Sequence, residues 1–173
     1  MLGVSAEVLD RLDRLIEKHR LHASGAEPVD LSPLLDAFKI RYLDLPPDVE
    51  AALVRWRAHG KTFTRLLYQP DLREPAQSAR KRYAGAHELA HAICDHRGDL
   101  YVMWRAGEPP GDFDSHLDRC RERECDRVAA YLLVPMPALR ELANMDVEYI
   151  AAVLDVPAHL IPLRWEVWQR SAR

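Results

Sequence analysis

The sequence predicts a mostly helical α+β fold with a small β-sheet. Apolar residues recur with the 3.6-residue period of a helix over most of the chain, as in the segment 6–20. By contrast, Thr62–Tyr68 and Leu100–Trp104 have the β-branched and aromatic content of strands. The length of 173 residues suits one domain with a substantial core. We therefore expect a single α+β domain in which helices outnumber strands.

The chain divides into helical segments at proline and glycine. Ser32 is a plausible N-cap with Pro33 at the first helical position, and Gly98 ends a later helix. The predicted helices are approximately Ala6–Arg20, a short helix after Ser32, Pro46 to near Gly60, Ala79–His96, Ser115–Val134, Ala138–Leu142, Val147–Leu154 and Ala158–Gln169. This gives a helical part over residues 1–60, a core over 61–135 and C-terminal helices over 136–173.

Charge and cysteine content restrict the classes of partner and compartment. The net charge of -3 provides no overall attraction to nucleic acid or to anionic membranes. The three cysteines form no C-x-x-C pair, which argues against a secreted disulfide framework and favours a reducing cytoplasm. The charged, amphipathic N-terminus lacks the apolar core of a signal peptide, and no apolar run is long enough to cross a bilayer. We expect a soluble cytoplasmic protein.

The segment GAHELAHAIC, residues 85–94, contains two histidines four positions apart. On a helix, His87 and His91 lie about 40° apart on one face, where two imidazoles can bind one zinc ion. Glu88 lies about 100° from His87, a position that suits a base better than a ligand. We expect the histidines to face a cleft while Ala86, Leu89, Ala90 and Ile93 pack inward. The alternative is an ordinary solvated helix surface with no metal. The presence of a third ligand decides between this alternative and a zinc site.

The predicted helix over 115–134 offers that ligand. Its apolar residues form one stripe facing the core, and Glu122 lies within this stripe, where a carboxylate needs a partner such as a cation. Asp126, four residues later, can accept a hydrogen bond from a ligating imidazole. Asp118 is a rival for the third position, and geometry alone does not exclude it. Cys94 also lies on the histidine face, but we expect a packed thiol there. His96 is expected to be a helix-end residue favoured by the helix dipole.

These two segments resemble the ImmA/IrrE family of zinc metallopeptidases. Arg82, Tyr83 and Ala86 match the residues before and within A-H-E-x-x-H, and the segment Glu122–Pro135 matches E-x-x-A-N/D-x-x-A-A-x-L-L-x-P except that cysteine replaces the common alanine at 125. The resemblance implies a zincin-like fold in which the HExxH helix packs against the glutamate-bearing helix. It also implies zinc bound by His87, His91 and Glu122, with Glu88 as catalytic base and Asp126 supporting a ligand.

The resemblance further implies hydrolysis of a peptide bond in a protein substrate. Members of this family often cleave helix-turn-helix repressors, and others belong to toxin–antitoxin modules. The rival hypothesis is a catalytically silent zinc-binding module that only sequesters its partner. No residue is assigned to stabilise the oxyanion, and the candidates are Tyr83, Tyr101, His116, Tyr131 and His159.

Direct nucleic-acid binding is the remaining alternative, because MDVEYIAAVLDVPAHLI, residues 145–161, can be read as a helix-turn-helix. The segment 144–162 contains three acidic residues, Asp146, Glu148 and Asp155, but neither lysine nor arginine. Such a segment repels the phosphate backbone, which supplies most non-specific affinity. We therefore expect a helical hairpin that closes the domain and makes no direct contact with nucleic acid.

Overall fold

The computed structural model describes residues 4–23, 25–38, 49–58, 61–68, 78–96, 100–104 and 116–171. Within these ranges the chain is mostly helical, as predicted. In chain order the elements are α1 (Ala6–His19), α2 (Ser32–Ala37), β1 (Val49–Ala58), β2 (Lys61–Tyr68), α3 (Ser78–Ile93), β3 (Leu100–Trp104), α4 (His116–Leu133), α5 (Met136–Glu141), α6 (Val147–Leu154) and α7 (Leu160–Ser171).

The three strands form one antiparallel sheet in the order β2-β1-β3. The pairing of β1 with β2 runs from Ala51 opposite Tyr68 to Ala58 opposite Lys61. The prediction of a helix between Pro46 and Gly60 is therefore wrong, because β1 occupies this segment as the central strand. Two neighbouring strands satisfy its backbone groups, and this tertiary pairing overrides the local helix preference of alanine, leucine and arginine. The predicted boundary at residue 60, between the N-terminal helical part and the core, consequently falls between the paired strands β1 and β2.

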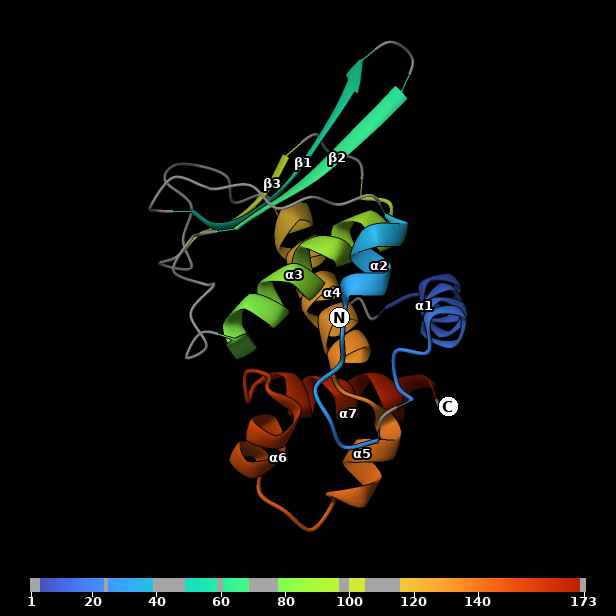
Figure 1. Ribbon diagram of the computed structural model, residues 1–173, viewed down its shortest axis with the longest axis vertical. Coiled ribbons are helices and arrows are strands. Elements are labelled where there is room, and N and C mark those ends of the chain that lie inside the picture. The colour runs from blue at the N-terminus through green and yellow to red at the C-terminus, as the bar shows by residue number, and fades with distance from the viewer. Residues whose placement is uncertain are drawn as a thin grey trace.

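Helices α3 and α4 pack against each other at the centre of the molecule (Figure 1). The sheet contacts α3 and α7 contacts α4, so the two central helices are covered from different sides. The fully buried leucines include Leu89 on α3 and both Leu132 and Leu133 on α4. Burying a leucine side chain contributes about 1.5–3 kcal/mol. The interface therefore fixes α3 relative to α4 and positions the side chains that meet between the two helices.

Helix α3 ends earlier than predicted, at Ile93, and the chain then turns back on itself. Asp95 adopts a left-handed conformation with φ 52°, and the His96 N–H donates to the His91 carbonyl at 3.1 Å. This six-to-one hydrogen bond is that of a Schellman motif, which usually has glycine at the left-handed position. His96 is thus a buried residue that follows the helix and lies close to His91, not the helix-end residue that we expected.

The start of α3 is anchored by residues distant in sequence. Ser78 donates to Asp155 at 2.7 Å, and the Arg82 guanidinium contacts both the Val29 carbonyl and Asp155. The arginine before the HExxH motif therefore holds α3 to the end of α6 and to the segment before α2. The Ser32 N-cap prediction is wrong: Leu31 is the N-cap, and the Ser32 N–H donates to the Asp30 carboxylate at 2.9 Å.

Candidate metal centre

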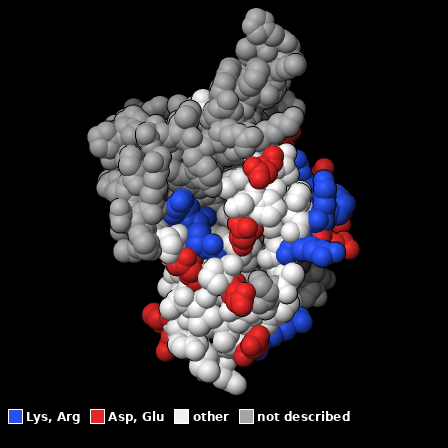
Figure 2. Space-filling view, viewed as in Figure 1, with Lys and Arg blue, Asp and Glu red and all other residues white. Residues whose placement is uncertain are grey.

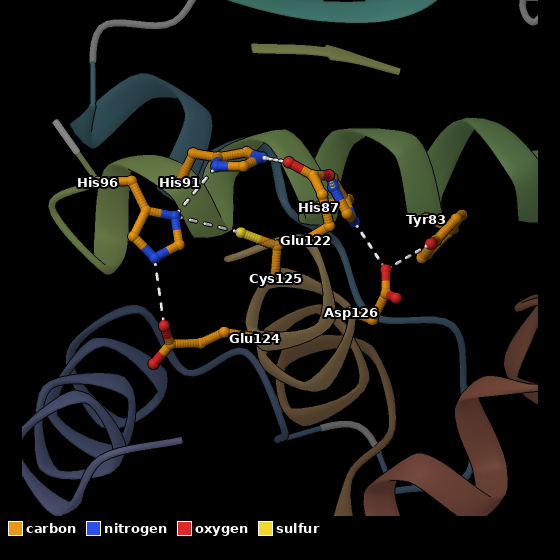
Figure 3. A network of polar contacts seen from close by, with 8 residues as sticks. All are labelled: Tyr83, His87, His91, His96, Glu122, Glu124, Cys125 and Asp126. Carbon is orange, nitrogen blue, oxygen red and sulfur yellow. Dashed lines mark hydrogen bonds and ion pairs between the residues drawn. The ribbon is translucent and has the colours of Figure 1, made fainter. Parts of the chain in front are cut away.

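The side chains of His87 and Tyr83 on α3 meet one carboxylate on α4 (Figure 3). The His87 Nδ1–H donates to Asp126 Oδ1 at 2.9 Å, and the Tyr83 hydroxyl donates to the same oxygen at 2.7 Å. Burial raises the pKa of Asp126, but the hydrogen bonds from His87 and Tyr83 outweigh it, and the net shift is downward. Asp126 therefore stays ionised, fixes the orientation of the His87 ring and directs its Nε2 away from Asp126.

Glu122 lies between the two HExxH histidines. Its Oε2 is 2.9 Å from His87 Nε2, and its Oε1 is 3.5 Å from His91 Nε2. Two ligands of one tetrahedral zinc ion are about 3.3 Å apart, given ligand distances near 2.0–2.1 Å. A shift of a few tenths of an ångström at His87 would accommodate the ion. The donor set of two imidazole nitrogens and one carboxylate therefore fits zinc, in the composition typical of catalytic sites.

Exposure around the two histidines differs from the expectation. The side chain of Glu122 is 48% exposed, whereas we expected a carboxylate buried within the core-facing stripe of α4. His91 is only 1% exposed and His87 is also buried, so both imidazoles are covered by protein, whereas we expected them to face a cleft. The sheet and α4 cover α3 from different sides and bury most of its second half. Glu122 is thus the most exposed of the three side chains that meet here.

The electrostatic environment of His87 is strongly negative. Burial lowers its pKa, but the hydrogen bonds to Asp126 and Glu122, together with the charge of Glu88, raise it to about 10. The imidazole thus holds a second proton on Nε2, the atom that would bind a metal. Because a cation can replace this proton, the same negative charge that stabilises the imidazolium also favours a divalent metal.

Glu88 is buried on α3 and is 1% exposed. Its charge acts on His87, so it lies close to the histidine pair. The role of Glu88 as a base next to the metal position stays a prediction from the angular offset on the helix.

The polar chain continues beyond His91. His91 Nδ1 lies 3.1 Å from His96 Nδ1, and His96 Nε2 lies 3.2 Å from Glu124 Oε2. If His91 binds a metal through Nε2, its Nδ1 carries the proton and donates to His96, whose Nε2–H then donates to Glu124. Figure 3 shows the resulting row of contacts, which runs from Tyr83 through the proposed ligands to Glu124. Sequence reasoning missed His96 as the partner of His91 and Glu124 as the partner of His96, because only the turn at Asp95 brings His96 back.

Cys125 is an alternative to Glu122 as the third ligand, and we did not predict it. It is fully buried, and its sulfur together with one nitrogen each of His87 and His91 forms a group whose atoms lie within 4.8 Å of one another. Glu122 is the better candidate, because its two oxygens face the Nε2 atoms of both rings. Burial raises the pKa of the Cys125 thiol well above its usual range and disfavours the thiolate that a metal needs.

Of the other candidates named from the sequence, Tyr83 and His159 lie beside Asp126, whereas Tyr131 lies elsewhere. Tyr131 donates to Asp13 at 2.6 Å and lies under the Arg164 guanidinium, and these contacts tie α4 to α1 and α7. His159 makes an edge-to-face contact with Tyr83, with ring centroids 5.0 Å apart. The Tyr83 hydroxyl is directed at Asp126, so Tyr83 supports the ligand environment. The side chains of Asp118, Tyr101 and His116 lie outside the described part of the structure.

Charges of both signs are interspersed over the described part of the face in Figure 2.

The segment 144–162, considered above for nucleic-acid binding, forms α6 and the start of α7. Asp146 caps α6 by accepting a hydrogen bond from the Tyr149 N–H at 2.7 Å. Among the described residues, no helix has both the length and the apolar character needed to cross a membrane.

A comparison with known families identifies the family of the chain. Residues 39–166 match the model of peptidase family M78, described as the IrrE N-terminal-like domain. Because the match covers well over half of the chain, the protein belongs to this family, and the resemblance drawn from the two motifs is confirmed. The family is one of peptidases. A search of the curated proteins finds no match.

Proposed function

We propose that the protein is a zinc-dependent metalloendopeptidase, with His87, His91 and Glu122 as ligands and Glu88 as the catalytic base. The observation that carries this proposal is the convergence of both histidine Nε2 atoms on the Glu122 carboxylate, at 2.9 and 3.5 Å. Three protein ligands leave a fourth tetrahedral position for water or substrate, as catalytic rather than structural zinc requires.

In this proposal each residue around the metal position has a separate task. Zinc, when bound, supplies Lewis-acid activation of water and of the scissile carbonyl. Asp126 holds His87 in the tautomer whose Nε2 is free to bind, and His96 does the same for His91. Glu88 accepts the proton of the attacking water and delivers it to the leaving amine. The half-exposed Glu122 marks the side from which a peptide reaches the site.

A Glu88→Gln variant tests the role of the base. It should bind as much zinc as the wild type, while its peptide-bond hydrolysis falls about 100- to 10,000-fold, the contribution typical of a general base. Zinc is measured on the purified protein, and cleavage is measured by mass spectrometry on a peptide library and on any helix-turn-helix repressor encoded beside the gene. A Glu88→Gln protein that cleaves at the wild-type rate would remove Glu88 from this role.

The same assay distinguishes a peptidase from a silent zinc-binding module. A wild-type protein that holds zinc and binds the repressor but leaves both the repressor and the library intact would support the silent module. The third ligand is tested by comparing Glu122→Gln with Cys125→Ser. We expect the first substitution to abolish tight zinc binding at the position of His87 and His91, and the second to preserve it there. The reverse result would assign the position to the thiol.

A further inference from the structure

We infer that the protein has a second cation site, formed by Cys94, His96 and Glu124 next to the peptidase centre and suited to zinc or another thiophilic divalent ion. One donor atom of each of these three residues lies within 4.8 Å of the other two. They come from the turn after α3 and from α4, and none belongs to the proposed ligand set of the peptidase.

The three donors are held in place by structure that does not depend on an ion. The Schellman turn at Asp95 returns the chain so that His96 is buried over α4, with its Nε2 3.2 Å from Glu124 Oε2. Cys94 is half-buried against the core, and its backbone N–H completes a hydrogen bond to Ala90 at 2.8 Å. Arg11 donates to the Ile93 carbonyl at 2.5 Å, directly before Cys94. Burial and the charge of Glu124 raise the pKa of the Cys94 thiol, and the charge of Arg11 offsets this only in part, so an ion that binds there must displace the thiol proton.

The chemistry of the set selects the class of ion. A thiol, an imidazole and a carboxylate together are typical zinc ligands, whereas calcium and magnesium take oxygen ligands almost exclusively. Three protein ligands leave the fourth tetrahedral position for water or another ligand. Cys125 Sγ, at 3.7 Å from His96 Nδ1, is a neighbour of the imidazole on the side away from Glu124.

The second site is coupled to the first through one hydrogen bond. With a metal on His91 Nε2, the His91 Nδ1–H needs His96 Nδ1 as acceptor at 3.1 Å. If an ion binds His96 through Nε2, the atom facing Glu124, the proton of His96 must be on Nδ1. Two N–H groups would then point at each other, so that hydrogen bond is lost. An ion at the second site therefore weakens the support of His91 and opposes the peptidase.

Cobalt titration of the metal-free full-length protein under reducing conditions tests the site without any cleavage assay. Thiolate ligation gives Co²⁺ a charge-transfer absorption in the near ultraviolet, which histidine and carboxylate ligands do not. We expect two Co²⁺ ions per wild-type chain, with the absorption accompanying one of them. Cys94→Ser should bind one ion without this absorption. His87→Ala removes the peptidase centre and should keep the absorption. Failure of the proposed function can therefore be distinguished from failure of the second site.

Matched variants assign the thiol. Cys120→Ser changes a partly exposed cysteine of α4 that belongs to neither donor group, and it should behave as the wild type. Glu124→Gln should weaken the second ion by more than about tenfold, since losing even an outer partner of a ligand costs that much. Binding of a single ion without the absorption by the wild type would overturn the proposal. So would an absorption that survives Cys94→Ser and disappears in Cys125→Ser.

An activity measurement tests the coupling. Excess Zn²⁺ beyond one equivalent should inhibit peptide hydrolysis by the wild type, and Cys94→Ser should be insensitive over the same range. Equal inhibition of both proteins would refute the opposition between the two sites.

Discussion

Replacing Asp126 by asparagine should weaken zinc binding although Asp126 is not itself a proposed ligand. Its Oδ1 accepts hydrogen bonds from the Tyr83 hydroxyl and the His87 Nδ1–H, at 2.7 and 2.9 Å. The asparagine carbonyl can still accept both, but the negative charge that makes the His87 imidazole a stronger ligand is lost. Partners of this kind are worth about 10- to 100-fold in metal affinity. At about 1.4 kcal/mol per factor of ten, the expected loss is about 1.4–2.8 kcal/mol.

The assay is a zinc competition titration against a chromophoric chelator, with circular dichroism to check that each variant is folded. Asp13→Asn is a matched control, because Asp13 also accepts a tyrosine hydroxyl, at 2.6 Å from Tyr131, but belongs to neither metal-binding group. It should bind zinc like the wild type. Tyr83→Phe should have a smaller effect than Asp126→Asn, since it removes one hydrogen bond and keeps the charge. A folded Asp126→Asn protein with wild-type affinity would refute the reasoning, and so would an equal loss in Asp13→Asn.

Two further predictions concern stability. Leu89→Ala in the α3 interface should lower the free energy of unfolding by about 2–5 kcal/mol, because Leu89 is fully buried, whereas Met145→Ala at a 51% exposed side chain should change it by less than about 0.5 kcal/mol in urea titrations. Burial lowers the pKa of His22, whose Nε2–H donates to the Leu132 carbonyl at 2.8 Å, below its usual value of 6.5. The unfolded chain therefore binds the proton more tightly, and stability is lost as the pH falls through 6.5 toward the folded-state pKa. His22→Gln should lose less stability over that pH range, and parallel pH profiles of the two proteins would contradict this.

Local sequence signals predicted the helices well where one face packs on a core. The boundaries of α6 coincide with the predicted ones, because Asp146 caps its first turn and apolar residues fix its buried face. The prediction failed at β1, where the segment VEAALVRWRA has good helix formers but lies between two strands. A local pattern does not contain the hydrogen bonds that distant strands contribute, so this error is one that propensity alone could not correct.

The sequence alone predicted the histidine pair proposed to bind the metal, the proposed base beside it and the segment of the proposed third ligand, because helical spacing places those side chains on defined faces. It also established the family, through two motifs that the family comparison matches. Only the tertiary structure decided that Glu122 is half exposed, that Cys125 competes for the same place, and that Cys94, His96 and Glu124 form a cluster. These depend on how α3 packs on α4 and on one left-handed residue after α3, and neither feature is encoded in the periodicity of a single segment.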